Sequence, residues 1–366
     1  MIDRIVIKGF KSIRELDLEL RPVNVLIGAN GAGKSNFIGF FELLQVLYRQ
    51  SLQRFVKEHG SAENLLHFGL KKTRAIKGEI YFEHKNAYKF RLYATSNRDL
   101  FIGNEDSGFN RNGTNPLEPN WDFQPISSDQ SESKLHTEKT ANNWRDRNHY
   151  LVKYFDRFSI FHFHDTSATA SIRGKCQVDD NKFLRSDGAN LAAFLYYLKE
   201  VHWQSFKKIE MAITSVAPFF SHFTLEPDRL NPNFIQLEWA EKGSDMYFNA
   251  THLSDGTLRF IALATLLLQP DPPGTILIDE PELGLHPFAI HKLAGLVSQV
   301  SATNQVIIST QSPTLVDQFE PESIITVDRK DQQSVFQRHD QAELQGWLEN
   351  YSLGEIWDKN IIGGRP

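Results

Sequence analysis

The chain is 366 residues long and 40% hydrophobic, which allows a substantial core in two or three compact units or in one large bilobed domain. Its net charge of −5 excludes a globally basic protein, so any contact with nucleic acid requires a local patch or a partner. One cysteine, Cys176, excludes an internal disulfide, and the sequence has neither a signal peptide nor an apolar run of about 20 residues, so we expect a cytoplasmic protein without a membrane segment.

The N-terminal part of the chain is predicted to form three strands and a helix around a glycine-rich loop. Strands are expected at residues 2–7, 16–20 and 23–27, from apolar alternation in the first two and a continuous apolar run in the third. The sequence GANGAGKS follows directly at residues 28–35, and an apolar helical pattern covers residues 37–48. The pattern G-x-x-x-x-G-K-[ST] between a strand and a helix is typical of a phosphate-binding P-loop.

The residue types of this loop suit a bound phosphate. Glycines permit positive φ angles and leave no Cβ between the backbone and the anion, so that successive N–H groups and the helix N-terminus point at it. Lys34 would place its charge on the β- and γ-phosphates, and Ser35 would offer a hydroxyl to Mg²⁺. The alternative is a tight turn from strand to helix that binds no ligand.

The middle of the chain is predicted to mix strands and helices around one polar insertion. Residues 96–143 are rich in Asn, Ser, Asp, Gly and Pro without a period, so we expect a partly flexible insertion that faces solvent. In a strand expected at residues 159–165, His162 and His164 share one face. The other elements expected here are a hairpin at 77–83 and 88–94, a helix at 148–158, a helix from 191 to about 216, strands at 223–226 and 234–239, and a long apolar helix that ends at 269.

A short buried strand is expected at residues 275–278, and it delivers two acids, Asp279 and Glu280, at its carboxyl end. In P-loop enzymes the first acid of such a pair holds Mg²⁺ through water, and the second orients or deprotonates the attacking water. The alternative is two acids at the start of an ordinary loop. The elements expected beyond this point are a helix at 287–300, a strand at 305–309, a helix at 312–319, a hairpin at 324–328 and 334–338, and a helix at 342–350.

The sequence LSDGTLR at residues 253–259 lies at the start of the long apolar helix. A Ser-x-Gly turn at a helix N-terminus offers a second surface for an anion. Such a surface makes sense if it closes on the γ-phosphate of another subunit. The alternative is an ordinary N-cap formed by Ser254.

Five motifs in this order resemble the ABC-type ATPase heads of the SMC, RecF and OLD group, which includes AAA-type RecF/OLD-like bacterial ATPases. The resemblance covers most of the chain and leaves out the insertion at 96–143. It rests on KGFKSI at 8–13, GANGAGKS at 28–35, LSDGTLR at 253–259, IDEPELGLHP at 278–287 and ISTQSP at 308–313.

The resemblance implies an α/β fold, a P-loop NTPase of the ABC-ATPase type that is bilobed. One lobe is mixed α/β with a central parallel sheet and an antiparallel β subdomain, and the other lobe is helical. On this chain, the resemblance places the α/β lobe at residues 1–95 and 270–340, the helical lobe with the signature motif at 166–269, and a C-terminal tail at 341–366.

The resemblance also implies roles for individual residues. His164 and Asp165 stand where such heads carry the Q-loop, whose usual residue is glutamine. From the residues alone, His162 and His164 could also be half of a metal site or the polar face of a strand. The implied contacts are nucleotide at Lys11, Ser12, Asn30, Gly31, Ala32, Gly33, Lys34, Ser35 and Asn36, the other subunit's γ-phosphate at Ser254, Gly256 and Arg259, the D-loop from Leu283 to His286, and Mg²⁺ at Ser35 and Asp279 with His164 or Asp165.

The third implied catalytic residue, after Glu280 and Lys34, is Gln311, where the related heads usually carry a histidine. An amide can hydrogen-bond a phosphate or a water, but it cannot carry positive charge or shuttle a proton. We therefore expect a slow ATPase, which a partner could stimulate.

The leading hypothesis is an ATP- and Mg²⁺-dependent ATPase that forms a homodimer around two ATP molecules and regulates an effector or a nuclease acting on DNA, in bacterial defence. The segment after the last expected strands is too short for a TOPRIM nuclease, so a nuclease of that type would be a separate chain. Higher oligomers and direct contact with DNA stay open. The alternatives are a RecF-like repair ATPase that binds DNA directly, the ATPase subunit of a transporter, which KGFKSI and the LHP extension disfavour, and a protein that binds ATP without hydrolysis.

Overall fold

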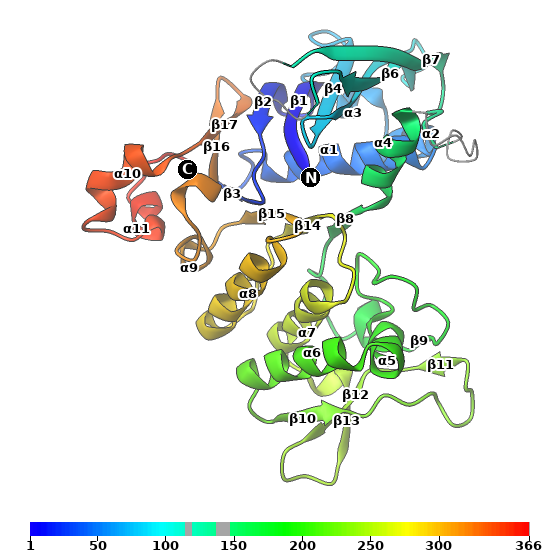
Figure 1. Ribbon diagram of the computed structural model, residues 1–366, viewed down its shortest axis with the longest axis vertical. Helices are drawn as coiled ribbons and strands as arrows, with labels where there is room; N and C mark the ends of the chain where they lie inside the picture. Colours follow the sequence, from blue (N-terminus) through cyan, green and yellow to red (C-terminus); the bar gives the residue numbers. More distant parts are fainter. Residues whose placement is uncertain (114–118, 137–146, 366) are drawn as a thin grey trace. The chain divides into compact units, whose positions relative to one another are not determined.

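The computed structural model describes residues 1–113, 119–136 and 147–365 (Figure 1). The chain divides into two compact units, one comprising residues 1–158, 321–351 and 355–366 and the other residues 159–320 and 352–354. Among the described residues, no helix has both the length and the apolar character needed to cross a membrane.

The first unit contains a six-stranded antiparallel sheet in the order β2-β1-β4-β5-β6-β7. The strands of this sheet are β1 (Ile2–Phe10), β2 (Ile13–Glu19), β4 (Ala75–Phe82), β5 (Asn86–Ala94), β6 (Leu100–Asn110) and β7 (Trp121–Gln130). Strands β6 and β7 lie within residues 96–143, where we expected a partly flexible insertion that faces solvent, and both extend the sheet. Residues 114–118 and 137–143 of that insertion lie outside the described residues.

The polar composition of β6 has a structural cause. Glu105 is fully buried, and its carboxylate accepts hydrogen bonds from Tyr88 Oη at 2.6 Å and from Ser127 Oγ at 2.7 Å. Ser133 Oγ and the backbone N–H of Lys134 also donate to it. A buried charge is tolerated when its lone pairs are filled in this way. Burial beside this carboxylate raises the pKa of Tyr88 well above its usual value.

A second set of strands in the first unit supports the glycine-rich loop. Strand β3 (Val23–Ile27) pairs parallel with β16 (Ile324–Lys330), and β16 pairs antiparallel with β17 (Gln333–Arg338). Helix α1 (Lys34–Tyr48) packs Phe40 against Phe10 and Phe90, with ring centroids 5.6 and 5.9 Å away, and Phe37 against Phe336 at 5.6 Å. The helix is apolar nearly all round because it contacts strands on more than one side.

The remaining helices of this part of the chain are short. Helix α11 is absent from the sequence-based expectation, which ends in a helix at 342–350. These helices are α2 (Leu52–Glu58), α3 (Ala62–Leu65), α4 (Arg147–Asp156), α10 (Gln341–Leu348) and α11 (Leu353–Asp358), with the 3₁₀ turn η4 (Pro321–Ser323) before β16.

In the second unit, strand β14 (Thr275–Asp279) pairs parallel with β15 (Gln305–Thr310), so that Asp279 lies opposite Ser309. Strand β8 (Phe158–Phe161) is the neighbour of β14. The strand predicted at 159–165 therefore ends earlier, although Phe161 and Phe163 stay buried and the alternation with the two histidines persists. The helices here are α7 (Asp255–Leu268), α8 (Pro287–Val300) and α9 (Pro313–Val316).

The rest of the second unit combines two α-helices with two small sheets (Figure 1). The continuous helix expected from 191 to 216 is broken at His202, whose φ of −128° and ψ of 54° lie outside the helical region. The strand expected at 223–226 lies at 220–223, and the stretch expected as one strand at 234–239 is divided between strands at 234–235 and 238–241. The elements are α5 (Leu191–Val201), α6 (Trp203–Val216), η2 (Ser171–Arg173), η3 (Ala250–His252), the sheet of β10 (Phe220–Phe223), β12 (Glu238–Glu241) and β13 (Tyr247–Asn249), and the pair β9 (Cys176–Gln177) and β11 (Phe234–Ile235).

Candidate functional site

The glycine-rich loop of the first unit ends in an open helix N-terminus. Gly31 and Gly33 have φ angles of 78° and 122°, which a residue with a Cβ rarely adopts. Helix α1 begins at Lys34, its N-cap residue Gly33 has no side chain to cap it, and its first turn holds no acid. A helix start of this kind, with its dipole, suits an anion.

Lys34 lies beneath this loop. Its side chain is nearly buried, and Nζ donates to the carbonyl oxygens of Gly28 at 2.5 Å and Ala29 at 3.2 Å. Asn30 and Ser35 are exposed on the loop, while Ala32 is buried. The lysine charge is thus held by the loop, and the serine hydroxyl that could meet a cation faces outward.

Ser334, which the sequence did not identify, joins the loop to the turn between β1 and β2. Its hydroxyl lies 2.6 Å from Ser12 Oγ and donates to the carbonyl of Ala32, and its backbone N–H donates to Ser12 O at 2.8 Å. Asn36 Nδ2 donates to Ser12 Oγ at 2.6 Å. Ser12 and Asn36 therefore meet at the loop. Ser334 joins them there, although 322 residues of sequence separate it from Ser12.

Lys11, the neighbour of Ser12, lies along helix α1. Its φ of 47° is left-handed, and its backbone is fixed by a bond from its N–H to Leu65 O at 2.9 Å. Nζ lies 5.4 Å from the centre of the Phe10 ring. Burial lowers the pKa of the Lys11 ammonium, and the charge of Glu42 opposes this shift.

The C-terminal tail also contacts the base of the loop. The backbone N–H of Gly364 donates to Asp328 Oδ1 at 2.7 Å, and Trp357 Nε1 donates to Gly364 O at 3.3 Å. A Cβ on Gly364 would lie 3.5 Å from Gly28 Cα, so the tail runs directly beside the first residue of the loop. Gly364 has a φ of 79°, which favours glycine. The sequence offered no signal for this contact.

The acids of the second unit lie at the carboxyl end of β14. Glu280 has a φ of 40°, which is unusual for a residue with a side chain, and its N–H donates to Ser309 O at 2.8 Å. Gln311 donates a side-chain N–H to Glu280 Oε1. The structure thus brings together Glu280, which was expected to act on the attacking water, and Gln311, which stands where related heads carry a histidine.

Glu282, which the sequence analysis did not single out, lies beneath this pair. Its Oε1 accepts hydrogen bonds from Thr310 Oγ1 and from the Gln311 N–H, the second at 3.1 Å. Its Oε2 is buried without a hydrogen-bond partner in the described part of the chain. Burial raises the pKa of the Glu282 carboxyl, and the nearby charge of Glu280 adds to the shift. Glu282, in the segment IDEPELGLHP, therefore anchors the segment ISTQSP.

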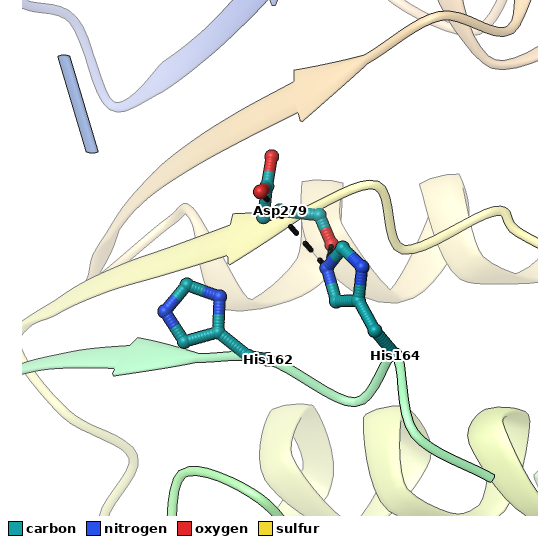
Figure 2. Close-up of side chains that lie close together, drawn as sticks. All are labelled: His162, His164 and Asp279. Atoms are coloured by element: carbon teal, nitrogen blue, oxygen red, sulfur yellow. Dashed lines mark hydrogen bonds and ion pairs between the residues drawn. The ribbon is translucent and has the colours of Figure 1, made fainter. Parts of the chain in front are cut away.

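The two histidines lie beside Asp279 (Figure 2). Asp165 is not part of this group. His164 Nε2 donates to the Asp279 carbonyl at 3.0 Å and lies 4.0 Å from Asp279 Oδ2. Asp165 is exposed and accepts from the Ser167 N–H and hydroxyl, and these bonds lower the pKa of its carboxyl. Of the two residues expected at the Q-loop position, His164 is therefore the one that contacts Asp279 at the end of β14.

The signature segment begins helix α7. Ser254 is the N-cap, because its Oγ accepts from the Thr257 N–H at 3.1 Å, so the capping alternative is realised whatever else this residue does. A Cβ on Gly256 would lie 2.2 Å from Gly284 O, which means that the signature turn and the D-loop touch within the same unit. Arg173 Nη2 bonds Asp255 Oδ1 at 2.7 Å.

Arg259 and the D-loop residues have different surroundings. Arg259 is buried, and its guanidinium donates to the carbonyls of Phe163 at 2.8 Å and His164 at 2.9 Å, so its contacts lie inside its own unit. Leu283 is 49% exposed on the D-loop. His286 is the N-cap of α8, where its Nδ1 accepts from the Phe288 N–H at 3.2 Å.

Comparison with known proteins gives the family and the fold. The family model described as "AAA domain, putative AbiEii toxin, Type IV TA system" matches residues 23–317. An OLD nuclease of Thermus scotoductus is 24% identical over an alignment of 381 positions, which covers 98% of this chain and 68% of that protein.

Solved structures of SMC heads share the fold. An SMC head bound to the C-terminal winged-helix domain of ScpA matches with a TM-score of 0.61 at 17% identity, covering 93% of this chain and 99% of the other. An SMC head with an extended coiled coil, bound to the C-terminal domain of ScpA derived from Pyrococcus furiosus, matches with a TM-score of 0.54 at 15% identity, covering 95% and 98%. The P-loop fold of the ABC-ATPase type is therefore confirmed, and the chain belongs to the AAA_21 family of SMC/OLD-like ATPases.

Proposed function

We propose that the chain binds ATP with Mg²⁺ on the loop at residues 28–35 and hydrolyses it slowly. The observation that carries this proposal is the glycine-rich loop at the start of helix α1, where Gly33 is the N-cap and the Lys34 side chain bonds back to the Gly28 carbonyl. A helix start of this kind, with a lysine and successive glycine N–H groups, suits a polyphosphate. Ser35 and Asp279 are oxygen donors of the kind that Mg²⁺ takes.

In the proposed reaction, Glu280 accepts a proton from water as the water oxygen attacks the γ-phosphorus. The bond from the γ-phosphorus to its bridging oxygen breaks, so ADP and phosphate are released. The Gln311 side-chain bond to Glu280 Oε1 leaves Oε2 to receive the proton. The bound Mg²⁺ would supply charge neutralisation at the phosphates. Gln311 is neutral, so it contributes orientation without the positive charge of a histidine, which accounts for slow turnover.

We further propose that two copies enclose two nucleotides, with Ser254 and Gly256 of one copy on the γ-phosphate bound by the other. Ser254 is exposed, and the D-loop that touches Gly256 exposes Leu283 at its surface. Phe288 is 48% exposed five residues further on. An exposed apolar edge next to an anion-binding turn favours burial against a second subunit.

The effector of this ATPase is proposed to be a nuclease or another protein acting on DNA in bacterial defence. Support comes from the OLD nuclease that shares sequence over almost the whole of this chain. Support for docking of a partner protein comes from the SMC heads, whose structures include bound domains of ScpA.

Steady-state hydrolysis of ATP tests the catalytic part of the proposal. The wild-type chain should turn over more slowly than about 10 s⁻¹, and Glu280→Gln should be at least about 100-fold slower while still binding ATP. Lys34→Ala should lose both binding and turnover. The matched controls Glu200→Gln and Lys57→Ala change exposed residues and should behave as wild type. Wild-type turnover by Glu280→Gln would overturn the assignment of Glu280.

A further inference from the structure

His162, His164 and Asp279 form one cluster within the second unit (Figure 2). One ligand atom from each side chain can be chosen so that all three lie within 4.8 Å of one another. All three side chains are partly exposed, so an ion could reach them from solvent. From sequence the histidines were at most half of a metal site, and the structure adds the third donor.

The backbone around the cluster is fixed from several directions. Arg259 binds the carbonyls of Phe163 and His164, and the His162 N–H donates to Ser186 O at 2.9 Å. Asp279 is held in strand β14 by its pairing with β15. Because the supporting residues are buried or paired, the donors converge without the cost of ordering a loose segment.

The donor set distinguishes between classes of cation. Two imidazoles and one carboxylate suit first-row transition ions such as Mn²⁺, Co²⁺ and Zn²⁺, whereas Mg²⁺ prefers oxygen donors only. We propose that His162, His164 and Asp279 bind a divalent transition ion in the absence of nucleotide. The inference deepens the proposed function, because Asp279 belongs to both.

The three donor atoms lie within 4.8 Å of one another and must move closer together to hold one ion. With bonds of about 2.0–2.2 Å, two donors on one ion lie about 3 to 4 Å apart, and His164 Nε2 is already 4.0 Å from Asp279 Oδ2. His164 now donates from Nε2 to the Asp279 carbonyl. For Nε2 to bind an ion, the neutral ring carries its proton on Nδ1 instead, and the hydrogen bond to the Asp279 carbonyl is given up.

Cobalt absorption spectroscopy on the full chain, without a polyhistidine tag and without nucleotide, tests the proposal. Co²⁺ should give saturable visible bands from a single site, and Zn²⁺ should abolish them, whereas a large excess of Mg²⁺ should not. His162→Ala and His164→Ala should each weaken Co²⁺ binding by more than about tenfold. The control His222→Ala removes an exposed histidine of β10 and should bind as wild type.

Two results would overturn the proposal: no saturable bands with the wild-type chain, or bands that persist unchanged in both histidine variants. Thermal unfolding of each variant checks that it is folded. Nucleotide binding, measured separately by fluorescence of a labelled ATP, keeps the two hypotheses apart. Loss of nucleotide binding in Lys34→Ala with intact Co²⁺ bands supports both. Co²⁺ bands in a wild-type chain that binds no nucleotide would contradict only the proposed function.

Discussion

The phosphate loop of the first unit and the acid segment of the second unit are built by different means. The loop is shaped by glycine backbone angles and by one helix start, all within residues 28–35. The acid segment is assembled from side chains of three separate stretches, residues 162–164, 279–282 and 310–311. The proposed binding therefore depends on the local backbone of one short loop. The proposed chemistry depends on contacts between residues that are distant in sequence.

The starts of helices α1 and α7 also differ. The N-cap residue of α1 is Gly33, which has no side chain, whereas Ser254 caps α7 and Asp255 lies in its first turn. A capped start that also carries an acid is less open to an anion than an uncapped one. Under the proposed function, the signature turn would therefore contact phosphate only together with a second subunit, whereas the P-loop would bind it within one chain.

The largest expected effect comes from replacing a glycine of the phosphate loop. Gly33→Ala places a Cβ 2.0 Å from Ser334 Oγ at a φ of 122°, so we expect a loss of about 3 kcal/mol or more in the free energy of unfolding. Gly31→Ala meets no atom within 4 Å at a φ of 78°, so it should cost only about 1 to 2 kcal/mol. Denaturant unfolding measures both, and equal losses would contradict the role of Ser334.

An intermediate effect is expected from the tail beside the loop. Asp328→Ala removes the acceptor for the Gly364 N–H and should cost about 1 to 2 kcal/mol. It should also speed amide hydrogen exchange in residues 355–365. Asp328→Asn keeps one oxygen acceptor and should restore most of the protection. Unchanged exchange in Asp328→Ala would show that the tail is held by other contacts.

The smallest effect concerns Glu282 and pH. Burial raises the pKa of this carboxyl in the folded chain, so above its ordinary pKa the unfolded chain loses the proton first. The contribution of Glu282 to stability should therefore fall as pH rises from about 4.5 through the raised pKa, by about 1.4 kcal/mol for each pH unit that separates the unfolded and folded pKa values. Glu282→Gln should flatten this fall in thermal unfolding curves measured from pH 4 to 8. The exposed control Glu200→Gln should keep the wild-type slope, and a Glu282→Gln curve parallel to wild type would contradict the assignment.

Features that lie within one short stretch of sequence were predicted well. The loop, the acids at the end of β14 and the helix at Pro287–Val300 follow from apolar patterns and short motifs, and the structure has them at those positions. Strand β6 was missed because Glu105 is polar, and its burial depends on hydroxyl partners that composition cannot reveal.

The contacts between distant residues could not be predicted. Ser334 lies beside the loop because β17 pairs with β16, and Gly364 lies there because of the path of the tail. Neither residue belongs to a motif that indicates what it contacts. The same holds for Asp279 as the third member of the histidine cluster. A single sequence predicts which segments form elements more readily than which side chains meet.

The mass of Glu280→Gln in solution, measured by light scattering with and without ATP and Mg²⁺, tests the central claim most directly. A dimer closed by two ATP molecules should persist when hydrolysis is blocked, so ATP should double the mass relative to the nucleotide-free chain. Adding Lys34→Ala to the same chain should abolish the increase. A mass that stays unchanged while ATP binding saturates would contradict the account.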